Sequence, residues 1–130
     1  MSWPSYYPAD CCPPEDAEVA RGPLFRFVPV NDGVVPRAFT CDLHNPHSNH
    51  TDADPCERAG LSVYRNQKTA EDALAFSPYL RKKKKIAVWQ GPGPVGVFKP
   101  TGPRPGHYTW WAPDGTQYVT MFSLVTGTQR

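Results

Sequence analysis

The residue types that most suggest chemistry are gathered between Cys41 and Cys56. Within these 16 residues lie three of the chain's four histidines and two of its four cysteines. Zinc takes four nitrogen or sulfur ligands in a tetrahedron, and close pairs on a loop often supply them. Cys41, His44, His50 and Cys56 are therefore candidate ligands of a structural zinc. The alternative, which the irregular loop favours, is a solvated polar segment without metal.

A second pattern suits transfer chemistry on NAD or nucleic acid. Toxin-class ADP-ribosyltransferases begin with a strand that bears Arg or His, continue with a Ser- or Tyr-bearing strand before a helix, and end with a catalytic acid. Arg26, followed by Ser62 and Tyr64, resembles the first two parts. The third part is missing, because the last third of the chain holds a single acid, Asp114, in a predicted turn. The resemblance implies NAD as substrate and a catalytic set of Arg26, Ser62, Tyr64 and His107.

The segment from His107 to Trp111 is the predicted functional surface. In a strand alternate residues share a face, so His107, Thr109 and Trp111 line one side. An aromatic wall beside a titratable imidazole suits the stacking of a base or ring. With Arg26 on an adjacent strand as the anion contact, Arg26, His107, Thr109 and Trp111 form the predicted ligand groove. The alternative is that loops or the N-terminal segment cover the aromatic side chain.

A run of five positive charges precedes a predicted strand. Such a run can neutralise phosphates and bind nucleic acid. It can equally stabilise a helix C-terminus or keep a strand edge from pairing with other chains. The formal net charge of +2 does not by itself require a polyanionic partner. The run comprises Arg81, Lys82, Lys83, Lys84 and Lys85.

Composition bounds the elements that position these residues. The chain has 130 residues, enough for one domain with a modest core. Its 16 prolines and 10 glycines exclude a coiled coil and indicate much loop. No apolar run approaches the roughly 20 residues of a membrane span, and the first residues do not have the layout of a signal peptide. We therefore expect a cytoplasmic location and free cysteine thiols.

The pattern of apolar and turn-forming residues predicts an α+β fold. We expect a mainly antiparallel sheet of about five or six short strands with one short helical unit. Residues 1–22 are predicted to be a weakly ordered proline-rich tail, and 23–126 a single domain with a long polar loop at 37–58. The predicted strands are 24–30, 60–64, 86–89 and 95–98, with a hairpin of 107–112 and 117–125, and the predicted helix is 69–76.

Three short motifs resemble a group of small uncharacterised bacterial proteins. They are Leu24-Phe25-Arg26, the C-x-x-x-G-L-S-V pattern that begins at Cys56, and Gly106-His107-Tyr108-Thr109-Trp110-Trp111. The resemblance implies a shared fold unit and no mechanism. It leads us to expect a binding or accessory module with a protein or small-molecule partner, from a toxin or defence operon. The competing expectations are the NAD-dependent transferase and a metal-stabilised nucleic-acid binder.

Overall fold

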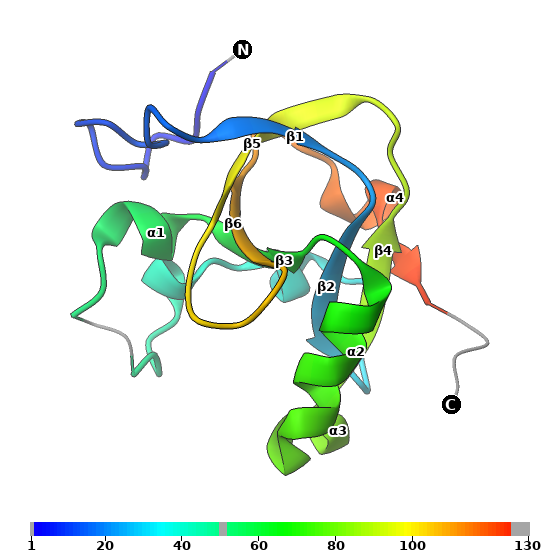
Figure 1. Cartoon of the computed structure of the whole chain (residues 1–130). Coiled ribbons are helices and arrows are strands. Elements are labelled where there is room, and N and C mark those ends of the chain that lie inside the picture. The colour runs from blue at the N-terminus through cyan, green and yellow to red at the C-terminus, as the bar shows by residue number, and fades with distance from the viewer. Residues whose placement is uncertain (1, 50–51, 126–130) are drawn as a thin grey trace.

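The computed structural model describes residues 2–49 and 52–125. Within these residues seven strands form one antiparallel sheet in the order β1-β5-β6-β3-β2-β4-β7 (Figure 1). The strands are β1 (Glu18–Arg21), β2 (Leu24–Pro29), β3 (Leu61–Tyr64), β4 (Lys84–Trp89), β5 (Pro94–Pro100), β6 (His107–Trp111) and β7 (Ser123–Leu124). The predicted α+β class with a mainly antiparallel sheet is therefore confirmed.

The helical elements are short and flank this sheet. The α-helices are α1 (Pro55–Ala59), α2 (Gln67–Phe76), α3 (Pro78–Lys83) and α4 (Tyr118–Met121), and the 3-10 turns are η1 (Pro36–Phe39) and η2 (Asp42–His44). The helix predicted from Thr69 begins two residues earlier, because Asn66 is the cap and its side chain accepts a hydrogen bond from the Thr69 N–H at 2.8 Å. Ser77 caps α3 in the same way.

Both faces of the sheet are packed. Leu24 and Val28 of β2 lie in the larger core, with Trp110 of β6. Phe25 lies in a second cluster against Ala70 and Ala73 of α2. Because side chains alternate along a strand, one apolar strand supplies both clusters. The strands that position the predicted site are therefore held from two sides.

The sheet is split between β2 and β3. β2 pairs with β4 through six consecutive residues but with β3 through the single pair Phe25 and Tyr64. Beyond that pair the backbones of β2 and β3 no longer form a ladder. Arg26 bridges the gap instead, because its Nη1 donates to the carbonyl of Ser62 at 2.7 Å. A side chain thus takes the place of missing main-chain pairing.

The predicted hairpin of 107–112 and 117–125 is wrong. Residues 118–121 form α4, and β7 pairs with β4 rather than with β6. Tyr118 and Phe122, four residues apart, both contact the ring of Phe39. That spacing matches one face of a helix, so tertiary packing selects helix where the turn residues suggested a strand.

The N-terminal residues are part of the fold. β1, within the predicted tail of 1–22, pairs with β5, and Tyr7 is buried. Cys12 forms a disulfide with Cys56 on α1, so the expectation of free thiols is wrong for this pair, whereas Cys11 and Cys41 are free. Sequence spacing could not reveal this pairing, because 44 residues separate the two cysteines. The predicted domain end at 126 lies outside the described residues.

No helix in the described ranges combines the length and apolar character needed to cross a membrane.

Candidate functional site

A pocket of about 670 Å³ opens at the split in the sheet. Its sheet wall consists of Arg26 from β2, Ser62 and Tyr64 from β3, and His107 and Thr109 from β6. The facing wall comes from the segment that the sequence predicted as a long polar loop, and includes η2 and α1. The rim carries Leu80 of α3 and Arg104 of the loop between β5 and β6.

Arg26 places a positive charge in the pocket wall. Its Nε and Nη2 donate to the carbonyl of Ala38 at 3.2 and 2.9 Å. Loss of solvation lowers the pKa of Arg26 to about 10, so the guanidinium remains charged at neutral pH. Among the described residues, no carboxylate lies within ion-pair distance of it. Its Cζ also lies 5.5 Å from the centre of the Phe39 ring. Carbonyl groups and a ring face do not neutralise a part-buried guanidinium, so no anion in the part of the chain that the structure describes compensates its charge.

His107 is held in one tautomer by its neighbours. Its Nδ1 lies 2.8 Å from the carbonyl oxygen of Thr101, an acceptor that requires the proton on Nδ1. Nε2 then presents a lone pair, and the hydroxyl of Ser62 donates to it. The two residues are diagonal neighbours on one face, since Ser62 is opposite Thr109 and Tyr64 is opposite His107. This arrangement makes His107 a base poised beside a hydroxyl.

Tyr64 contributes a largely buried aromatic residue to the pocket lining. Its ring is 6% exposed and meets the His107 ring edge-on at a centroid distance of 5.3 Å. Burial raises the pKa of the Tyr64 phenol, while the charge of nearby Arg104 opposes that shift. The phenol is therefore neutral at physiological pH.

The structure brings together all four residues of the predicted transferase set. Arg26, Ser62, Tyr64 and His107 line the same pocket although they come from three strands. Antiparallel pairing of β3 with β6, and the Arg26 bridge across the split, produce this convergence.

Three of the four predicted groove residues also line the pocket, but Trp111 does not. Its side chain is 1% exposed and packs with Tyr7, Cys56 and Ala59. Its Nε1 donates to the carbonyl of Cys56 at 2.8 Å. The prediction that Trp111 forms an aromatic wall of the groove is therefore wrong, because α1 and the N-terminal segment cover this end of β6.

The close contact between α1 and β6 depends on Gly60. A Cβ at this position would lie 2.4 Å from Cγ2 of Thr109 and 3.1 Å from Nε1 of Trp111. Only a residue without a side chain lets the end of α1 approach β6 so closely. Gly60 thus sets the distance between α1 and β6 where both contribute to the pocket.

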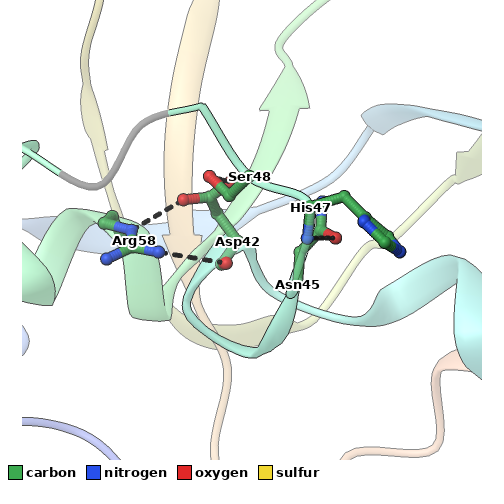
Figure 2. A network of polar contacts seen from close by, with 5 residues as sticks. All are labelled: Asp42, Asn45, His47, Ser48 and Arg58. Atoms are coloured by element: carbon green, nitrogen blue, oxygen red, sulfur yellow. Dashed lines mark hydrogen bonds and ion pairs between the residues drawn. The ribbon is translucent and has the colours of Figure 1, made fainter.

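The facing wall holds charged residues that the sequence did not single out. Asp42 accepts from Nε of Arg58 at 2.7 Å and from the hydroxyl of Ser48 at 2.6 Å (Figure 2). The main-chain N–H of His47 donates to the side chain of Asn45 at 3.0 Å in the same loop. These contacts fold the polar loop against α1, and no spacing in the sequence announced them.

Glu57 and Arg104 are the other charged pocket residues that sequence reasoning missed. Glu57 lines the wall facing His107, and Arg104 lines the rim. Glu57 directly follows Cys56 in the second of the three motifs. This position was the one feature of the sequence that could have indicated a functional role for Glu57. Arg104 lies in a turn-rich connection, where no feature of the sequence indicated a functional role.

The three predicted zinc ligands within the described residues, Cys41, His44 and Cys56, do not form a metal-holding group. Cys56 is in the disulfide, Cys41 is buried, and His44 packs edge-on against Tyr6 at a ring-centroid distance of 4.3 Å. His50 lies outside the described residues. Among the residues placed by the structure, no group of three or more His, Cys, Asp or Glu is positioned to hold a metal ion. Disulfide formation by Cys56 removes one thiolate from the predicted ligand set.

The basic run divides between two elements. Arg81, Lys82 and Lys83 are exposed in the last turn of α3, whereas Lys84 and Lys85 begin β4. Burial and the neighbouring charge of Arg26 lower the pKa of Lys84. Positive charge therefore continues from α3 through Lys84 to Arg26, which lines the pocket.

Comparisons with protein-family models, curated proteins and solved structures find no match for this chain.

Proposed function

We propose that the protein is a binding module for a small organic anion, held in the pocket at the split of the sheet. The observation that carries this proposal is the uncompensated charge of Arg26. Two of the five guanidinium N–H groups have no acceptor among the described residues, given the three bonds to Ala38 and Ser62. A phosphate or carboxylate would satisfy both the charge and these donors.

The size and remaining walls of the pocket favour a nucleotide-like ligand. A volume of about 670 Å³ lies in the range typical of small-molecule sites. Tyr64 and His107 supply ring surface at the sheet wall. Arg104 at the rim adds a second cation. A ligand with one ring and one or two phosphates matches this combination.

Thermal unfolding with AMP, ADP-ribose and NAD tests the proposal. A ligand at about 100 times its Kd stabilises the folded state by about 2.7 kcal/mol, so the melting temperature should rise. Arg104→Gln should reduce the rise, while Arg37→Gln, which removes the same charge from an exposed ion pair with Asp32, should leave it unchanged. Arg26→Lys keeps the charge but removes the planar donor set, and should weaken binding.

The proposal fails if none of the three ligands changes the melting temperature of a folded wild-type protein. It also fails if Arg104→Gln and Arg26→Lys bind as tightly as wild type. Circular dichroism of each variant without ligand separates loss of binding from loss of folding, because Arg26 also bridges β2 and β3.

Transfer chemistry on NAD is a second candidate function. The specific observation in its favour is the convergence of Arg26, Ser62, Tyr64 and His107 in one pocket. In such a reaction the bond between nicotinamide and ribose C1′ breaks, and nicotinamide leaves with the bonding electrons. The acceptor's nucleophile bonds to C1′ and its proton passes to His107. Glu57, on the facing wall, is the available acid in place of the missing late carboxylate.

Incubation of the protein and a cell lysate with labelled NAD tests this candidate. A transferase leaves label on a product, and Glu57→Gln and His107→Gln should each abolish labelling without lowering the melting temperature. Binding of NAD without any labelled product would reject transfer and leave the binding function standing.

The biological setting remains the expectation carried by the three motifs. An accessory role in a bacterial toxin or defence operon, with a protein or small-molecule partner, is part of the proposal. Genes adjacent to the coding sequence test it, because a toxin or antitoxin gene should accompany it.

A further inference from the structure

α2 and α3 present a surface that is both aromatic and cationic. Phe76 is 74% exposed and Tyr79 is 65% exposed, whereas large aromatic side chains are usually covered. Arg81, Lys82 and Lys83 are exposed on the next turn of the chain. We call these five residues the α2–α3 surface. Figure 1 shows α2 lying beside β2 and β4, with α3 following it at the end farthest from β1 and β5.

The positive charge of the α2–α3 surface is not neutralised within the fold. Within residues 2–49 and 52–125, no ion pair involves the basic run. The acids of the preceding helix are occupied: Asp72 pairs with Lys68 at 3.1 Å, and Glu71 accepts from Gln67 at 2.9 Å. A polyanion would therefore meet cations that do not have to give up an internal partner.

The same surface continues into the pocket. The guanidinium of Arg104 lies 4.6 Å from the centre of the Phe76 ring, and Arg104 also lines the pocket. Leu80, on the turn between Tyr79 and Arg81, lines the pocket as well. Arg104 thus links the exposed ring of Phe76 to the pocket, and Leu80 links α3 to it.

We propose that the α2–α3 surface binds single-stranded nucleic acid, with one nucleotide directed toward the pocket. Exposed rings offer faces on which unpaired bases stack, and the adjacent cations neutralise the phosphates between them. A duplex does not present free base faces to such rings. A membrane partner suits this surface less well, because α3 has six residues and lacks the long apolar stripe of an interfacial helix.

Fluorescence anisotropy with labelled single-stranded oligonucleotides of DNA and RNA tests the proposal. The DNA and the RNA oligonucleotide should both bind, and their affinity should fall steeply as the salt concentration rises from about 50 to 200 mM. Phe76→Ala and Tyr79→Ala should each weaken binding about fivefold or more. Lys82→Glu with Lys83→Glu should weaken it further and reduce the salt slope. Lys68→Glu, on the same helical unit but paired with Asp72, is the control and should have a small effect.

Heparin separates base stacking from charge alone. Because heparin carries charge without bases, the two aromatic substitutions should leave its binding within about twofold of wild type. An equal loss for heparin and oligonucleotide would overturn the stacking argument. No oligonucleotide binding at 50 mM salt, tighter binding to a matched duplex, or preference for phosphatidylserine vesicles would each overturn the proposal.

The proposed strand binding at the α2–α3 surface and the proposed ligand binding in the pocket can be rejected separately. The binding of a strand to the α2–α3 surface does not rest on the proposed anion site, whereas the direction of one nucleotide toward the pocket does. Arg26→Lys should weaken AMP binding and remove only the pocket's contribution to oligonucleotide affinity, a smaller loss than that of Lys82→Glu with Lys83→Glu. If the wild-type protein binds the oligonucleotide but not AMP, the proposed pocket function is rejected and the proposed binding of a strand to the α2–α3 surface stands.

Discussion

Trp111 should support the fold rather than bind a ligand directly. Replacing it with Ala removes an indole that is 1% exposed between α1 and the N-terminal segment. It also removes the hydrogen bond that Nε1 donates to the carbonyl of Cys56 at 2.8 Å. Because α1 carries Glu57 and Arg58 of the facing pocket wall, the substitution also disturbs the pocket indirectly.

The expected loss is large for a domain of this size. Truncating a buried Trp to Ala typically costs about 3–5 kcal/mol of unfolding free energy, because a cavity remains where the ring was. The Cys56 carbonyl, left without its donor, belongs to the same loss. Single domains are stable by about 5–15 kcal/mol, so about a fifth or more of the total disappears. Trp111→Phe keeps most of the ring and should lose less than half as much.

Equilibrium unfolding in guanidinium chloride measures this loss. Far-ultraviolet circular dichroism is the suitable signal, since the substitution removes a tryptophan and alters the fluorescence. The midpoint should fall with the slope unchanged. Tyr79→Ala is the matched control, because its aromatic ring is 65% exposed and its loss should change stability by less than about 0.5 kcal/mol.

A result within about 1 kcal/mol of wild type for Trp111→Ala would refute this reasoning. If ligand binding were lost at the same time, Trp111 would return to the ligand-contacting role that the strand alternation first suggested.

Three further predictions follow from the same packing. Cys56→Ser should lower the free energy of unfolding by up to about 4 kcal/mol, because the disulfide closes a loop of 44 residues, and reductant should lower the wild type toward the variant in a denaturant titration. Burial raises the pKa of Tyr118 to about 12 and raises that of Tyr7 as well. The folded state then binds more protons than the unfolded chain, so the free energy of unfolding should fall as pH rises from about 10 through 12. The double variant Tyr7→Phe, Tyr118→Phe should show a smaller fall over the same pH range. Gly60→Ala should destabilise the protein by about 1–3 kcal/mol, because its Cβ would clash with a side chain of β6, and an unchanged melting temperature would show that α1 can move away.

Local patterns predicted the elements that carry the candidate site. Alternation and β-branched or aromatic content predicted strands at 24–30, 60–64 and 107–112, each within one residue of β2, β3 and β6. Those strands hold Arg26, Ser62, Tyr64 and His107, so the transferase resemblance named residues that line one pocket. The α+β class followed from the same patterns.

Predictions that required knowledge of distant contacts were wrong. The segment after Asp114 carries a strand-like composition, yet Tyr118 begins the short helix α4 and Phe122 directly follows it, and both pack against Phe39. Cys56 looked like a metal ligand among nearby histidines, yet its partner is Cys12, from the N-terminal segment that was predicted to be a weakly ordered tail. Neither partner can be inferred from spacing.

The sequence alone determined which side chains share a strand face, because the period of two is a property of the backbone. It therefore set His107 and Thr109 on one side of their strand. Only the tertiary structure decided what each of those side chains meets. The Cys12–Cys56 disulfide and Gly60 bring α1 over Trp111 and bury it, while the split between β2 and β3 leaves His107 beside an open pocket. Burial depends on contacts between residues far apart in the chain, and a local repeat carries no information about them.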